Sequence, residues 1–161
     1  MPRHRDQPDS TYHLRQPIPP ELYPAERCAG PPPDGLLTGI AQFNQREYFA
    51  CHETLEQVWN AEPGPIRTLY KGILQVGVGC YHLLRGNYRG ATIKLRTGAD
   101  YLAPFAPGCM GVEVGALIAD ALRLRAAVVV LGPERIGEVD LALLPRITLA
   151  PGTARENDPA R

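Results

Sequence analysis

The chain has 161 residues, enough for one domain with a buried core and too few for two domains of ordinary size. Its 17 basic and 17 acidic residues balance, so no net field recruits nucleic acid or an anionic membrane. No apolar run reaches the roughly 20 residues that a membrane helix needs, and no early run resembles a signal peptide. We therefore expect a soluble protein with no specific nucleic-acid partner and no membrane partner.

The cysteine pattern gives an expectation about the redox environment. Cys28, Cys51, Cys80 and Cys109 lie more than twenty residues apart and form no Cys-x-x-Cys pair. This spacing argues against both a structural zinc knot and a redox-active dithiol. We therefore expect reduced cysteines and a cytoplasmic location.

Both ends of the chain differ in composition from its middle. Residues 1–33 are rich in proline and close on the run Pro31-Pro32-Pro33, which predicts an extended or disordered arm. Such an arm is either a solvated tail or a polyproline segment that binds a partner. Residues 151–161 are polar and predict a mobile tail. The domain itself is expected over residues 34–150.

The first two helices are predicted from capping residues and apolar spacing. Asp34 is the expected N-cap of a short helix that ends near Phe43. Asn44 followed by Glu47 resembles a capping box, and it predicts that the second helix starts there and ends near Asn60.

Three further helices are predicted over residues 66–85, 88–102 and 112–131. Gly86 and Asn87 are expected to end the third helix and to cap the fourth. Residues 126–131 are rich in β-branched side chains, but the chain has no second strand with which they could pair, so we predict helix. Residues 141–149 are expected to be extended or irregular and to pack back on the bundle. The predicted fold is an all-α, single-domain bundle of about five helices.

Polar side chains fall on apolar faces of the second and third helices. At 100° per residue, His52 and Glu56 share an arc with apolar side chains, and Glu53 lies at its edge. On the third helix, Lys71, Gln75 and His82 share one side with three glycines. Buried polar groups need partners, so we expect the two faces to meet in a polar pocket.

The three glycines of the third helix, Gly72, Gly79 and Gly86, recur every seven residues. An internal glycine costs a helix about 0.8–1 kcal/mol relative to alanine, so the glycines need a compensating role. Either they let another helix approach closely, against the Trp59 face, or they line a groove for a ligand.

These residues carry a resemblance to a known family. The pattern F-N-x-x-x-Y-F-x-x-H-E-x-L-E-x-x-W, followed by K-G-I-L-Q, Y-H-L-L-R-G-N-Y-R-G-A and G-V-E-V, resembles the bacterial and archaeal domain of unknown function 309. The resemblance covers roughly residues 36–124. It implies a small all-α bundle. Members of this family are sometimes described as predicted metal-dependent hydrolases. The motif positions are Phe43, Asn44, His52, Glu53, Leu55, Glu56, Trp59, Gly72, Gln75, His82, Gly86, Asn87, Gly90 and Ala91.

One hypothesis for the polar residues is a metal-dependent hydrolase. His52 and Glu56, spaced i and i+4, would bind zinc, manganese or iron together with His82 from the facing helix. Glu53 would be a general base or would support the ligands, which makes the candidate catalytic set His52, Glu53, Glu56 and His82. The spacing departs from H-E-x-x-H because Glu56 replaces the second histidine, so protease chemistry is not implied.

The alternative hypothesis is a structural hydrogen-bond network in a non-catalytic binding or interaction module. In this interpretation a histidine shares a proton with Glu53 or Glu56, and Gln75 bridges them.

A basic stretch indicates the class of ligand. Residues 85–96 read RGNYRGATIKLR and contain no acidic residue. The amides behind Asn87, beside Arg85 or Arg89, would bind a phosphate or carboxylate, and the alternative is a solvated basic face. A small anionic ligand is therefore the expected partner. The candidate substrate-binding residues are Trp59, Lys71, Gln75, Arg85, Asn87 and Arg89.

Overall fold

The computed structural model describes residues 22–153. In this range the chain forms α-helices and short 3-10 turns and has no β-strand, which confirms the predicted all-α bundle. None of these helices is both long enough and apolar enough to cross a membrane. The six α-helices within residues 22–153 are α2 (Ala25–Ala29), α3 (Asp34–Asn44), α4 (Tyr48–Ala61), α5 (Arg67–Leu84), α6 (Tyr88–Leu102) and α7 (Val114–Leu131).

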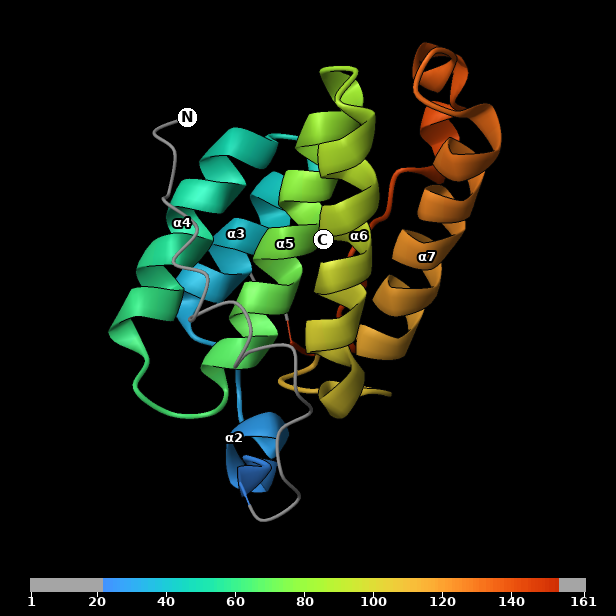
Figure 1. The fold of residues 1–161 in the computed structure, drawn as a ribbon. Helices are drawn as coiled ribbons and strands as arrows, with labels where there is room; N and C mark the ends of the chain where they lie inside the picture. The colour runs from blue at the N-terminus through green and yellow to red at the C-terminus, as the bar shows by residue number, and fades with distance from the viewer. Residues whose placement is uncertain (1–21, 154–161) are drawn as a thin grey trace.

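Helix α5 is the centre of the bundle. Figure 1 shows α5 between α4 and α6, with α3 behind it and α7 on the outer side of α6. Because neighbours surround most of α5, its residues are buried from Thr68 to Tyr70 and from Gly72 to Cys80. Leu36, Ile40 and Phe43 of α3 are buried in the same core. The continuous apolar character of α5 is what a core helix needs.

The glycines of α5 bring α6, not the Trp59 face, into close contact. A Cβ atom on Gly72 would lie 2.7 Å from Leu102, and one on Gly79 would lie 2.9 Å from Leu95. Gly98 of α6 lies against the α5 backbone in the same interface. The helix-packing alternative is therefore confirmed, but the prediction of the packing partner was wrong. Gly86 has a different role, because its φ of 73° ends α5.

The boundary between α3 and α4 differs from the sequence prediction. Asp34 is the first helical residue, and Pro33 is the N-cap. Asn44 is the last residue of α3, and α4 begins only at Tyr48, so no capping box forms. The physical reason is the left-handed backbone of Arg46, with a φ of 62°, which interrupts the helix.

The later helix ends agree with the prediction. The Asn87 side-chain oxygen accepts a hydrogen bond from the Gly90 amide at 2.9 Å and caps α6. Helix α7 continues to Leu131 and ends at Gly132, so residues 126–131, with their three valines, are helical.

The segment after α7 packs back on the bundle, as predicted. It contains two short 3-10 turns, Ile136–Glu138 and Leu141–Leu143. Ile147 is only 2% exposed, and Leu149 forms an isolated bridge with Val112. This C-terminal segment therefore covers part of the core.

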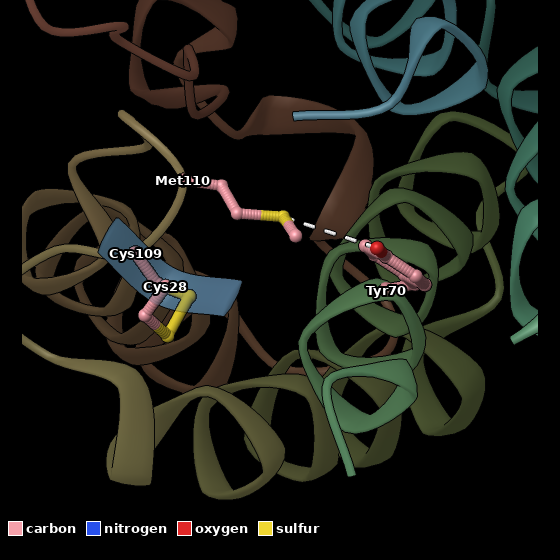
Figure 2. The surroundings of a disulfide bond; sticks show 4 residues. All are labelled: Cys28, Tyr70, Cys109 and Met110. Carbon is pink, nitrogen blue, oxygen red and sulfur yellow. Dashed lines mark hydrogen bonds between the residues drawn. A yellow bond between two sulfur atoms is a disulfide. The ribbon is translucent and has the colours of Figure 1, made fainter. Parts of the chain in front are cut away.

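Two predictions for the N-terminal arm and the cysteines were wrong. Ala25–Ala29 form α2, and Cys28 is joined to Cys109 by a disulfide (Figure 2). The two cysteines are 81 residues apart in the sequence, so their spacing gave no sign of the pairing. Cys51 and Cys80 are free and buried. Residues 30–33 of the predicted arm form no helix, and Pro33 is extended. Residues 1–21 of the arm and residues 154–161 of the predicted tail lie outside the described residues. A cytoplasmic location stays a prediction.

Candidate functional site

Helices α4 and α5 lie against each other in opposite directions. Near the end of α4, the Trp59 ring is next to Lys71 of α5. Near the start of α4, the Phe49 ring lies 6.4 Å from the Tyr81 ring. This register places the middle of α4 alongside the middle of α5. We use the term α4–α5 face for His52, Glu56, Trp59, Arg67, Lys71 and Gln75.

His52 and Glu56 form a pair on α4, as their i, i+4 spacing predicts. The Nδ1 atom of His52 lies 3.8 Å from Oε2 of Glu56. The side chains are 15% and 30% exposed, so solvent reaches both only in part. Glu53, the third predicted catalytic residue of this helix, is exposed. Its role as a general base stays a prediction.

Two cations lie over the Trp59 ring. The Arg67 guanidinium carbon is 4.2 Å from the ring centroid, and the Lys71 ammonium nitrogen is 4.8 Å from it. Both distances are within the range of a cation–π interaction. Trp59 Nε1 and Arg67 Nε are buried and have no hydrogen-bond partner among the described residues. Buried donors of this kind need an acceptor from water or a ligand.

Gln75 is the most buried polar side chain of the face. It is only 6% exposed, and its Oε1 atom has no hydrogen-bond partner within residues 22–153. Leaving a buried carbonyl oxygen unpaired costs about 1–3 kcal/mol. Lys71 lies one helical turn earlier on α5. The face therefore combines an unsatisfied acceptor with a nearby positive charge.

His82 lies at a separate corner, where α5 ends and α6 begins. Its Nδ1 atom is 3.3 Å from the side-chain nitrogen of Asn87. Its ring also packs on Gly90, where a Cβ atom would lie 2.7 Å from the ring. Burial lowers the pKa of His82 below its ordinary value, and the positive charge of Lys94 lowers it further.

The predicted metal ligands do not come together. No group of three or more histidine, cysteine, aspartate or glutamate side chains in residues 22–153 is arranged to hold a metal ion. His82 is therefore not gathered with His52 and Glu56, and a pair of ligands is too few for a zinc site. The residues present do not fit zinc, manganese or iron as the sequence predicted.

The basic stretch is only partly available to an anion. The Arg85 guanidinium lies 5.5 Å from the Tyr81 ring centroid, and Arg96 lies 3.5 Å from the carboxylate of Asp100. The Asn87 side chain already occupies the Gly90 amide, while Arg89 is exposed. Anion binding by Arg85, Asn87 and Arg89 at the start of α6 stays a prediction.

Sequence reasoning missed two cations that contribute to these sites. Arg67 lies one turn before Lys71, so its i−4 spacing could have placed it on the same face. Lys94 lies one turn after Gly90 on α6. Because Gly90 contacts His82, Lys94 also lies near the His82 imidazole. That contact depends on how α5 and α6 pack, which local spacing does not reveal.

The pKa of His82 provides the first prediction. The folded protein should hold His82 neutral at pH values where the unfolded chain, with the ordinary pKa, is already protonated. The stability contributed by neutral His82 should therefore fall as the pH decreases through the pKa of His82 in the unfolded chain towards its lower pKa in the folded protein. In NMR titration, Lys94→Met should raise the pKa of His82, whereas Lys71→Met should not. Equal effects of the two substitutions would contradict the assigned cause.

The comparisons with known proteins concern the first half of the bundle. Residues 36–93 match the family described as Domain of unknown function (DUF309). The chain is also 38% identical over 61 residues to the uncharacterized protein YpuF of Bacillus subtilis (strain 168). That match covers 37% of this chain and 35% of the relative, so the chain matches only about a third of that protein's length. No solved structure matches the chain significantly.

Proposed function

We propose that the domain binds a small anionic ligand on the α4–α5 face, all of which lies within residues 36–93, the range that matches the DUF309 family. The observation that carries the proposal is the buried, unpaired carbonyl oxygen of Gln75, one helical turn from Lys71. The carboxylate or phosphate group of such a ligand would be attracted by the charge of Lys71, and a hydroxyl or amine donor on the ligand would satisfy the Gln75 oxygen.

The charges on the face indicate which way such a ligand lies. Arg67 and Lys71 both stand over Trp59 and make one end of the face positive. The carboxylate of Glu56 lies one turn before Trp59, beside His52, and disfavours an anion there. The anionic end of the ligand therefore belongs at Arg67 and Lys71, and its donor end belongs towards Glu56.

The proposal concerns binding and does not include metal-dependent hydrolysis. The candidate catalytic set of the sequence analysis is divided, because His82 pairs with Asn87 at the start of α6. Glu53 is exposed on α4. The groups that remain together on the face are suited to recognise charge and hydrogen bonds.

A thermal-shift experiment tests this proposal with two probes, inorganic phosphate and glycerol phosphate, at constant ionic strength. Both should raise the melting temperature, and glycerol phosphate should do so more, because it also carries hydroxyl donors for Gln75. A ligand at ten times its Kd adds about 1.4 kcal/mol to the free energy of unfolding. Lys71→Met should remove most of the shift.

The matched control is Arg123→Met, which removes a cation that is 67% exposed on α7. This variant should keep the full shift. An unchanged melting temperature of the parent with both probes, or equal losses in the two variants, would contradict the proposal.

Gln75→Met should have opposite effects on stability and on binding. The substitution removes the unpaired buried carbonyl and roughly keeps the side-chain volume, so the unliganded protein should gain about 1 kcal/mol in free energy of unfolding. The additional shift from glycerol phosphate over inorganic phosphate should disappear. Gln57→Met, at an exposed position of α4, is the control and should change neither quantity. A loss of stability in Gln75→Met would show that the carbonyl is already satisfied.

A further inference from the structure

Among residues 22–153, helix α2 is attached to the bundle mainly by a disulfide, a backbone hydrogen bond and an ion pair. It has five residues, none of which is buried. A helix this short has no independent stability in water. The disulfide from Cys28 to Cys109 fastens it to the loop before α7 (Figure 2). The Met110 amide also donates a hydrogen bond to the Cys28 carbonyl at 2.7 Å.

One ion pair adds to this attachment. The Arg27 guanidinium donates two hydrogen bonds to the Glu62 carboxylate, at 2.8 and 3.3 Å. The Arg27 side chain is 50% exposed, whereas Glu62 is 14% exposed. Solvent therefore weakens the pair, and ion pairs at such positions contribute at most about 1 kcal/mol.

The loop on the other side of the disulfide adopts an unfavourable backbone conformation. Met110 has a φ of 51°, in the left-handed region that non-glycine residues rarely adopt. This conformation costs about 1–2 kcal/mol and persists only where the surroundings impose it. Two restraints hold this loop in place. They are the disulfide between Cys109 and Cys28 and the hydrogen bond from the Met110 amide to the Cys28 carbonyl.

We propose that the Cys28–Cys109 disulfide is a reversible redox latch, whose reduction releases α2 from the Met110 loop while helices α3–α7 stay folded. The reductant is a dithiol. Its two electrons and two protons convert the S–S bond into two thiols, and its own sulfur atoms form a disulfide. Cys28 is half-buried and Cys109 is only 2% exposed, so the dithiol would attack from the Cys28 side.

Two features make the release local. None of the buried residues of the core belongs to α2, and Cys28 of α2 only packs against the core as a partly buried residue. The free thiols of Cys51 and Cys80 lie inside this core, and burial raises the pKa of each to about 12. Thiols of this kind do not exchange with the disulfide, because the thiolate is the reactive form.

Alkylation tests this proposal, since each cysteine reports on a different part of the molecule. The full chain is reduced with dithiothreitol under native conditions, pulsed with iodoacetamide and analysed by mass spectrometry. Cys28 and Cys109 should react at similar rates, and both should react at least about tenfold faster than Cys51 and Cys80. Protection of Cys109 at the level of Cys51 would show that α2 stays in place. Similar rates at all four cysteines would show global unfolding, and either result would overturn the proposal.

A variant tests the contribution of the ion pair. In the oxidised protein, Glu62→Gln should speed reduction of the disulfide by dithiothreitol several-fold, because it weakens the second attachment of α2. Glu138→Gln, which weakens the exposed pair with Arg135, is the matched control and should leave the rate unchanged. Equal rates in the two variants would contradict the assigned role of Arg27 and Glu62.

Discussion

Gly98→Ala should destabilise the protein, although alanine is the better helix former. A Cβ atom at this position of α6 would lie 2.6 Å from Cγ2 of Val76, 2.9 Å from the Val76 backbone nitrogen and 3.1 Å from the Gly72 carbonyl oxygen. The last two atoms belong to the backbone of α5, so the two helices must separate. Overpacking of this kind costs about 1–3 kcal/mol or more, which outweighs the gain of up to 1 kcal/mol in helix propensity.

Gly77→Ala should have the opposite effect and is the matched control. Gly77 lies in the middle of α5, and its Cβ atom would lie 3.5 Å from the Phe43 ring and 3.9 Å from the Cys51 sulfur, which are ordinary contact distances. We expect a gain of about 0.5–1 kcal/mol from helix propensity. Urea unfolding of both variants gives the two free energies of unfolding. A stabilised Gly98→Ala protein would contradict the close approach of α5 and α6.

The long helices could be predicted from the sequence because local patterns determine them. Helix α5 was expected over residues 66–85 and forms over Arg67–Leu84, with Gly86 ending it. Helix α2 could not be predicted, because five residues are too few for a periodic pattern. It is held by a covalent bond to a residue 81 positions away.

The site was predictable within one helix and less so between helices. The i, i+4 spacing correctly paired His52 with Glu56. Between the two helices, Lys71 of α5 lies over the Trp59 ring of α4, and the meeting of the polar side chains themselves stays a prediction. The sequence predicts that His82 lies near His52, because helical spacing puts the two residues on polar faces of α5 and α4 that are expected to meet. In the structure the His82 ring packs on Gly90 of α6. No spacing within α5 contains that information.

The role of Asn44 shows the same limit. Its sequence context, with Glu47 three residues later, is typical of a capping box. In the structure its amide nitrogen instead donates to the Ile147 carbonyl at 3.0 Å, and its oxygen accepts from the Ile147 amide at 2.8 Å. The partner lies 103 residues away, so only the folded bundle brings the two together.

Asn44→Ala should therefore cost about 2–4 kcal/mol in free energy of unfolding. It would leave both the amide and the carbonyl of Ile147 without a partner, and Ile147 is only 2% exposed. Asn60→Ala, at an exposed position in the last turn of α4, is the matched control and should change stability by less than about 0.5 kcal/mol. The measurement is urea unfolding combined with hydrogen exchange of the Ile147 amide, which should lose its protection in Asn44→Ala. Equal stabilities of the two variants, with the Ile147 amide still protected, would show that the C-terminal segment is held by its apolar contacts alone.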